Sequence, residues 1–203
     1  MTEPDTRFPI VGIGASAGGI PAMEDLFKGM AESPGVAFVI VTHLSPERES
    51  LLHEVIARYT DMPVLVAEDD AAVEADHVYV MPPNTILTIK EGKLQARRPN
   101  TINREHKPID IFLSALAEDQ GEYAVAVILS GGDGDGTLGA KAVKERGGFT
   151  LAQTVDGSGP RNPRHARKRD LRRHDRHCCP GRADGREDRR FRAQFRHAGR
   201  ACL

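Results

Sequence analysis

Short runs of apolar residues alternate with longer amphipathic segments along most of the chain, which is the pattern of strands and helices that take turns. Three runs are apolar throughout, which indicates strands buried on both faces of a sheet. They lie at 9–14 (PIVGIG), 36–42 (VAFVIVT) and 124–129 (AVAVIL). Two shorter runs, at 63–67 and 149–153, predict further strands.

Between these strands, apolar residues recur at spacings of three and four, as they do on one face of a helix. This pattern predicts helices over 18–31, 50–59, 108–116 and 137–146, and Pro108 suits the first position of its helix. Residues 77–95 interrupt the alternation of strands and helices. Their sequence predicts two short strands with Glu91 and Gly92 at a hairpin turn. The sequence therefore predicts an α/β domain with a mainly parallel sheet and one hairpin.

Composition divides the chain into two parts. The net charge of -1 hides a contrast, because acidic residues outnumber basic ones up to residue 150 and basic ones predominate afterwards. All three cysteines lie in the later part, so the body has no disulfide framework and no thiol nucleophile, which suits a reducing cytosol. No signal-peptide pattern and no apolar run of about 20 residues is present. We expect a cytoplasmic protein without membrane insertion.

The last part of the chain differs in kind from the rest. From Arg161 it is rich in arginine, has hardly any aliphatic residue and shows no apolar face. We therefore assign 1–7 to a disordered N-terminus, 8–154 to the domain and 155–203 to a basic, disordered tail. We interpret the tail as out-of-frame translation, which would leave the domain without its terminal strand and helix. A nucleic-acid-binding arm is the alternative, but a basic run without interleaved aromatic residues supports it weakly.

The sharpest chemical motif is G-x-S-x-G at 14–18, between a buried strand and an amphipathic helix. Flanking glycines permit a tight turn that holds the hydroxyl of Ser16 above the sheet edge, as in a nucleophile elbow. The backbone N–H of Ala17 and the helix start behind it are candidate donors to an oxyanion. The alternative is that Ser16 only caps the helix.

The same glycines also suit a dinucleotide-binding turn, which is a rival interpretation. Such a turn needs an acidic residue at the end of the second strand to hold the ribose. Here that strand is followed by His43, and no carboxylate occurs before Glu47. A histidine at this position favours a general base, although a lone histidine after a strand is often an ordinary loop residue.

A glycine-rich loop, 130–136, follows the third buried strand and leads into a helix. Either Asp133 or Asp135 could orient the imidazole of His43, and Gly132 is a candidate second oxyanion donor. The alternative without a catalytic role is a flexible loop whose aspartate caps the next helix. A calcium loop is excluded, because the glycine and glutamate that it needs at its sixth and twelfth positions are replaced by leucine and lysine. We expect no metal and no cofactor.

Several motifs in order resemble one family. IGASAGG after the first strand, THL after the second, HKPID at a helix start and ILSGGDGDGTLGAKAVKERGG are similar to the catalytic domain of chemotaxis protein-glutamate methylesterases, over about residues 8–154. THLSPERESLL and MPPN resemble the variety that is fused to methyltransferase and sensor modules. The resemblance implies a doubly wound sheet in three α/β/α layers.

The resemblance also implies a serine hydrolase with Ser16 as nucleophile, His43 as general base and Asp135 as orienting acid. Family members hydrolyse glutamyl methyl esters of chemoreceptors, with release of methanol, and many deamidate receptor glutamines. A methylated receptor is the implied substrate and a methyltransferase an implied partner. His106 and Asp110 match a family motif, and we expect them to support the site or cap a helix.

The sequence departs from the family in the glycine loop. Gly132 stands where many members have methionine, and Asp133 is an unusual neighbour whose charge could disturb the histidine. A catalytically impaired regulatory or binding module is therefore the alternative function. Loss of the terminal strand and helix would expose apolar surface, so we also expect low stability.

Overall fold

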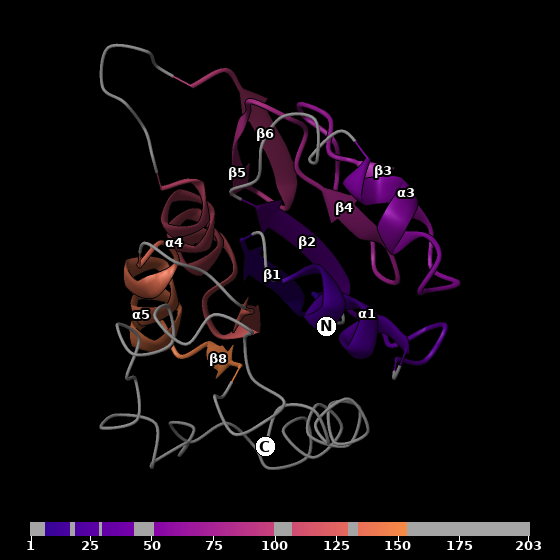
Figure 1. Cartoon of the computed structure of the whole chain (residues 1–203). Coiled ribbons are helices and arrows are strands. Elements are labelled where there is room, and N and C mark those ends of the chain that lie inside the picture. The colour runs from indigo at the N-terminus through magenta and orange to yellow at the C-terminus, as the bar shows by residue number, and fades with distance from the viewer. Residues whose placement is uncertain are drawn as a thin grey trace, which may run out of the picture.

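A computed structural model describes residues 7–16, 19–28, 30–42, 51–99, 107–129 and 134–153. In it, six strands form one sheet in the order β3-β4-β2-β1-β7-β8, and all neighbours pair in parallel (Figure 1). The strands are β1 (Ile10–Ala15), β2 (Ala37–Thr42), β3 (Val64–Val66), β4 (Val78–Val80), β7 (Ala124–Ile128) and β8 (Phe149–Ala152). Apart from Arg7, the predicted disordered N-terminus (1–7) lies outside the described residues, and so do the predicted disordered tail (155–203) and the predicted loss of the terminal strand and helix.

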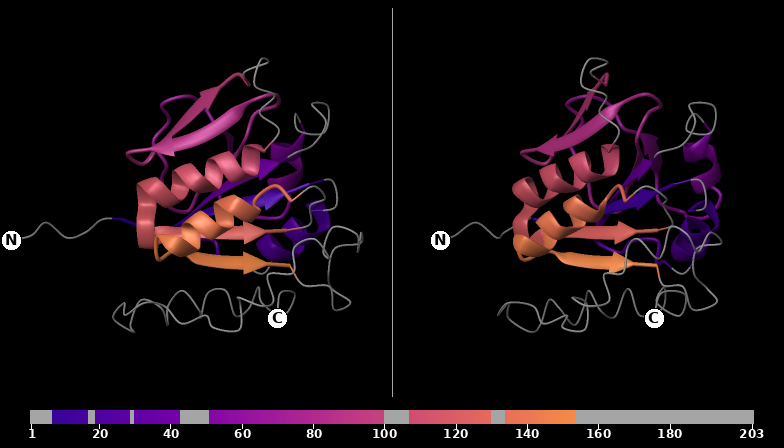
Figure 2. Two further views of the ribbon diagram at one scale, coloured as in Figure 1. Left: turned by 90° about the vertical axis from the view of Figure 1, so that its left-hand side faces the viewer. Right: turned by 60° about the vertical axis from the view of Figure 1, so that its left-hand side comes forward.

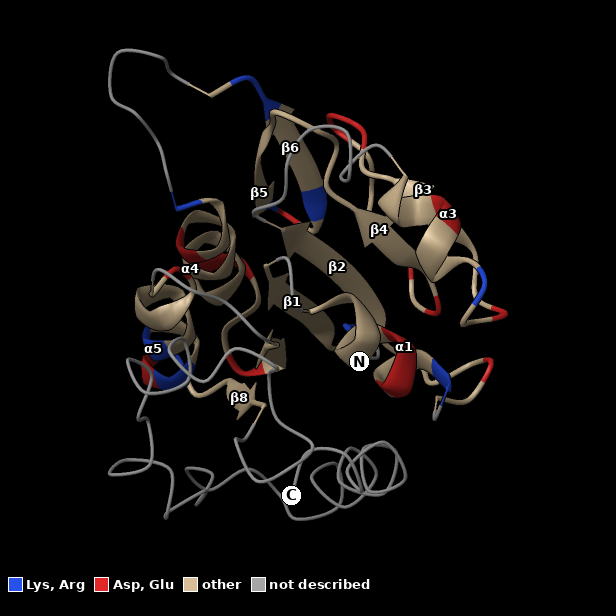
Figure 3. Cartoon of the chain, in the orientation of Figure 1, with Lys and Arg blue, Asp and Glu red and all other residues tan. Residues whose placement is uncertain are grey.

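The three central strands, β2, β1 and β7, are those with continuous apolar runs. Every residue in them is buried, because helices or other elements cover both faces of the sheet. The strands of the sheet carry no charged residue, as Figure 3 shows. The prediction of doubly buried strands is therefore confirmed.

The two faces of the sheet belong to two separate apolar clusters. Successive residues of a strand point to opposite faces. Val11 and Ile13 of β1 pack with α1 (Ile20–Lys28) and α3 (Leu52–Ile56). Ile10 packs on the other face, in the cluster that includes α4 (Pro108–Gln120) and α5 (Thr137–Glu145) (Figure 2). The doubly wound, three-layered arrangement is thereby confirmed.

A β-hairpin lies against α4, outside the main sheet. Its strands, β5 (Ile86–Lys90) and β6 (Lys93–Arg97), meet at Glu91 and Gly92, which have φ values of 54° and 71°. Positive φ at both central residues is typical of a two-residue hairpin turn. Asp119 of α4 accepts hydrogen bonds from both turn N–H groups, which holds the hairpin on the helix. The hairpin and its turn residues are as predicted.

One strand of the sheet, β4 (Val78–Val80), was not predicted as part of it. β4 joins the parallel sheet between β3 and β2, although the sequence pattern places residues 77–95 outside the βαβ rhythm. The run is only three residues long and so shows no period.

A short 3-10 helix (Gly121–Tyr123) connects α4 to β7. Among the described residues, none of the helices has the length and apolar composition required to cross a bilayer.

Helix α4 approaches β1 very closely. A Cβ atom on Gly12 would lie 2.6 Å from Leu113 Cδ2, and one on Gly14 would collide with Ile109 Cγ2. Only glycine at these two positions allows the helix to pack at this distance. The packing places the N-terminus of α4 next to the carboxyl end of β1.

Candidate active site

The carboxyl ends of β1, β2 and β7 meet at one edge of the sheet. Ala15 pairs with Thr42, and the N–H of Leu129 donates to Gly14 O at 2.9 Å. β2, which follows β1 in the chain, lies on one side of β1, and the later strand β7 lies on the other side. The direction of the strand order therefore changes at β1, and open α/β sheets bind ligands at such a switch point.

Ser16 follows β1 directly and is half-buried. Its carbonyl oxygen accepts the N–H of Gly19 at 2.8 Å, and a Cβ on Gly19 would lie 2.6 Å from Ala15 Cβ. The chain therefore turns tightly here, and Ser16 itself keeps a negative φ. The turn leads straight into α1, whose first N–H groups have no partners within the helix. The positive end of the α1 dipole thus lies close after Ser16 in the chain.

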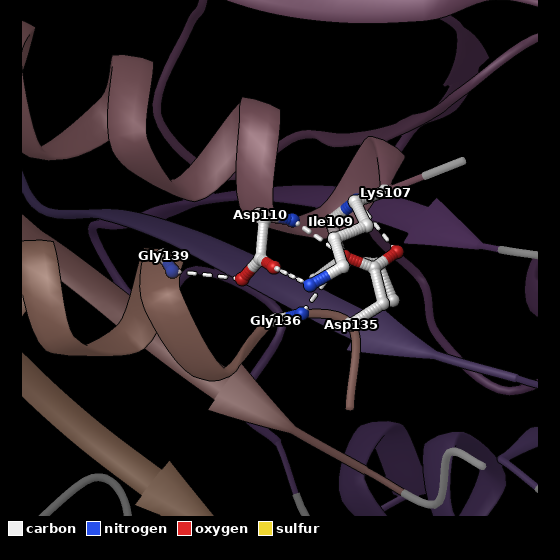
Figure 4. A network of polar contacts seen from close by, with 6 residues as sticks. All are labelled: Lys107, Ile109, Asp110, Asp135, Gly136 and Gly139. Carbon is white, nitrogen blue, oxygen red and sulfur yellow. Dashed lines mark hydrogen bonds and ion pairs between the residues drawn. The ribbon is translucent and has the colours of Figure 1, made fainter. Parts of the chain in front are cut away.

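Asp135 is buried, with 1% of its surface exposed. Its Oδ2 accepts the N–H of Ile109 at 3.1 Å, and its Oδ1 accepts those of Asp110 at 2.8 Å and Gly136 at 2.9 Å (Figure 4). The residue before the helix, Lys107, makes no side-chain cap. Asp135 therefore caps α4 from a different segment of the chain.

Two opposing influences act on the Asp135 carboxyl group. Burial raises its pKa above the ordinary value, the three backbone N–H groups oppose this, and the charge of Asp110 adds to the increase. The net result is a raised pKa. A carboxylate has about four lone-pair positions, so three backbone donors leave room for an imidazole donor.

Packing connects Asp135 to the end of β1. A Cβ on Gly136 would lie 2.8 Å from both Ile109 Cγ2 and Ile128 Cδ1, and Gly14 faces the same two side chains. The turn that carries Asp135 and the strand that leads to Ser16 therefore share their neighbours. Two of the three predicted catalytic residues thus come from adjoining parts of the same sheet edge.

Asp110 is the other buried acid of this region, with 6% of its surface exposed. Its Oδ1 accepts the N–H of Gly139, in the first turn of α5, at 2.8 Å. The expected helix-capping role of Asp110 is confirmed. The sequence could not reveal that Asp110 and Asp135 cap each other's helices, because the capping contacts join positions more than 20 residues apart.

Thr42 is a polar residue that sequence reasoning missed. It ends β2, beside Ala15, and is 1% exposed, and its Oγ1 has no hydrogen-bond partner. The only sequence signal is that a hydroxyl ends an otherwise apolar strand.

Five predicted site residues lie outside the described residues: His43, Ala17, Gly132, His106 and Asp133. The complete triad and its oxyanion donors therefore stay a prediction. Position 43 does follow Thr42, the last residue of β2. Within the described ranges, no three metal-binding side chains gather.

Comparison with known proteins gives one family. A family model described as CheB methylesterase matches residues 11–171, which extends into the segment that the sequence pattern assigns to the tail. The crystal structure of the Thermotoga maritima CheB methylesterase catalytic domain aligns with a TM-score of 0.66 and 28% identity, over 74% of this chain and 82% of that one.

Named proteins show the same similarity. Proteins called protein-glutamate methylesterase/protein-glutamine glutaminase from Carboxydothermus hydrogenoformans and Pseudomonas syringae pv. tomato are 33% and 34% identical, over 73% and 75% of this chain. The chain spans 46% of the length of each. An uncharacterised 104.1 kDa protein of Rhodobacter capsulatus is 43% identical over 98 residues, which are 48% of this chain and 10% of that protein.

Proposed function

The chain belongs to the CheB methylesterase family, and from this premise we propose that it is a serine hydrolase of glutamyl methyl esters on chemoreceptors. The reaction converts the ester to a carboxylate and releases methanol. The observation that carries the proposal is a buried acid whose turn packs on the same two side chains as the strand that leads to Ser16, at the ligand-binding edge of a parallel sheet.

The first half of the reaction is acylation. Ser16 Oγ gives its proton to His43 and attacks the γ-carbonyl carbon of the ester. The resulting tetrahedral oxyanion is stabilised by backbone N–H groups, for which Ala17, the residue after Ser16 in the sequence, and Gly132 are the candidates. When the tetrahedral intermediate collapses, the C–O bond to the methoxy group breaks, and the imidazolium protonates the leaving methoxide.

The second half is deacylation. Water loses a proton to His43, attacks the acyl-enzyme and displaces Ser16, which takes the proton back. Throughout both halves, Asp135 orients the imidazole and stabilises its charged form. A glutamine side chain in the same position would release ammonia in place of methanol, which is the deamidation that the proposal also covers.

The burial of Asp135 supports this role. A carboxylate that is excluded from water and fixed by three backbone N–H groups cannot rotate, so it holds a partner imidazole in one orientation.

The cellular location and the partner of the chain are part of the same proposal. The cysteine-free body suits the cytoplasm. The motifs THLSPERESLL and MPPN, which resemble the variety of the family that is fused to methyltransferase modules, support a methyltransferase as a partner.

Methanol release from a receptor carrying methyl-labelled glutamates tests the proposal. We expect Ser16→Ala to abolish release, while Ser33→Ala, which changes an exposed serine, leaves it unchanged. Undiminished release from the Ser16→Ala variant would remove Ser16 from the mechanism. A folded parent chain that releases neither methanol nor ammonia would overturn the proposed function itself.

A further inference from the structure

Two buried carboxylates lie next to each other at the proposed site. In the described part of the chain, Asp110 and Asp135 are the acidic residues that are buried. Asp135, which precedes α5, binds N–H groups in the first turn of α4, and Asp110, which lies in the first turn of α4, binds the N–H of Gly139 in the first turn of α5 (Figure 4). The two helix starts are thus joined by a reciprocal pair of caps.

The cap on α5 does not need the charge of Asp110. One oxygen, Oδ1, makes the bond to Gly139, and the neutral oxygen of an asparagine would make the same bond. The other oxygen, Oδ2, is buried and has no hydrogen-bond partner. Among the described residues, the cation that pairs with Oδ2 is the Nζ of Lys107 at 3.6 Å, on a side chain that is 53% exposed. A buried carboxylate with one unsatisfied oxygen is costly, and more so beside a second carboxylate.

We propose that Asp110 is a positioning residue that acts on the proposed catalytic acid by its charge as well as by its cap. The inference rests on the proposed function, because it assigns a purpose to a costly charge beside Asp135. Asp110 increases the negative potential at Asp135 and, through it, the stability of the imidazolium that forms when His43 takes the serine proton. The charge therefore favours the reaction at the expense of folding stability.

The direction of the effect follows from the groups around Asp135. The first turn of α4 contributes Asp110, and the residue before that helix contributes Lys107, which pairs with Asp110, whereas β1 and the first turn of α5 contribute no charged side chain. Like charge makes Asp135 bind a proton more tightly, which agrees with the raised pKa of this group. His43, His106 and Asp133 lie outside the described residues, and all variants below keep them unchanged.

Asp110→Asn is the decisive variant, because it keeps an oxygen for Gly139 and removes only the charge. We expect the carboxyl 13C signal of Asp135 to titrate at lower pH than in the parent chain. We expect the acid limb of kcat/KM for ester hydrolysis also to move to lower pH, and kcat to fall by about tenfold, a small part of what a general base contributes. The melting temperature should stay equal or rise, which a purely structural role would not produce.

Two further variants complete the test. Asp119→Asn makes the same substitution at the far end of α4, and we expect it to leave both titrations unchanged even if it loosens the hairpin. Lys107→Met removes the cation beside Asp110, so both titrations should move in the opposite direction, to higher pH. This second variant decides the matter if Asp110→Asn does not fold.

The outcomes separate the two proposals. An Asp135 titration that is the same in the parent, Asp110→Asn and Lys107→Met chains overturns the role of Asp110. A shifted titration with unchanged kcat and pH profile also overturns it, because the charge then has no effect on the reaction. A parent chain without hydrolase activity defeats the proposed function, while the Asp135 titration still decides whether the two carboxylates are coupled.

Discussion

Three polar side chains are buried in the described part of the molecule: Thr42, Asp110 and Asp135. All three lie near the carboxyl edge of the sheet, whereas the rest of the buried residues are apolar or glycine and proline. Polar groups buried at a cost tend to mark functional sites. At the scale of single residues, the site is therefore visible as the place where the apolar core is interrupted.

Thr42→Val should stabilise the protein. Valine has the shape of threonine and removes a buried hydroxyl without a partner, so the free energy of unfolding should rise by about 1 kcal/mol. Thr42→Ser, which keeps the hydroxyl and loses a methyl group, should lower it by a similar amount. Denaturant titration measures both. A loss of stability in the valine variant would show that the hydroxyl has a partner in solution.

Asp135→Asn should destabilise the protein in a pH-dependent manner. At least one backbone N–H then faces an amide donor, which costs about 1–3 kcal/mol. The native pKa of Asp135 is raised, so its protonation favours the folded state, and this contribution is fully present below the ordinary aspartate value and lost as the pH rises through the native pKa.

The stability gap between parent and Asp135→Asn chains should therefore widen as the pH falls through that range. Urea titrations at a series of pH values measure the gap. A gap that narrows towards low pH would mean that the native pKa is lowered, and our assignment of its cause would be wrong.

At the scale of elements, the site depends on how closely α4 packs against its neighbours. Glycines at both contacts make this possible: Gly12 and Gly14 face α4 from β1, and Gly139 faces it from α5. The sequence predicts the helices and central strands from their apolar periodicity. It does not predict this close packing, because a glycine in a strand or helix has the same local pattern whether or not another element approaches it.

Gly139→Ala tests this packing. In an exposed helix the change would stabilise by roughly 1 kcal/mol, because alanine has the higher helix propensity. Here the new Cβ would lie 2.5 Å from Leu113 Cβ and 3.1 Å from the backbone oxygen of Asp110. We expect a net loss of about 1–3 kcal/mol, measured by thermal unfolding. A stabilised variant would contradict the close contact of the two helix starts.

At the scale of the whole molecule, the two apolar clusters share the strands of one sheet. Ile13 belongs to the cluster beneath α1, and Ile128 belongs to the one beneath α4. Ile→Val at either position should lower one common unfolding midpoint, each by about 1 kcal/mol. Far-UV and near-UV circular dichroism should report the same transition in both variants. Separate transitions would show that the two faces unfold independently.

The architecture was predictable to a large extent because fully apolar strands and amphipathic helices alternate in the chain. The sequence also predicts that Ser16 and Asp135 lie at strand ends, since both follow apolar runs. The mutual capping by Asp110 and Asp135 and the unpartnered hydroxyl of Thr42 could not be predicted, because they depend on which residues meet in three dimensions. β4 escaped prediction because three residues are too few to show a period.

The central claim is that Ser16 is activated at this edge by an imidazole that Asp135 orients. Mass-spectrometric mapping of a fluorophosphonate adduct tests it most directly, because the probe reacts with activated serines. We predict an adduct on Ser16 in the parent chain and slow or absent labelling in the His43→Ala and Asp135→Ala variants, with folding checked by circular dichroism. An adduct on another serine, or equal labelling of Ser16 in folded variants without the imidazole or the carboxylate, would contradict the account.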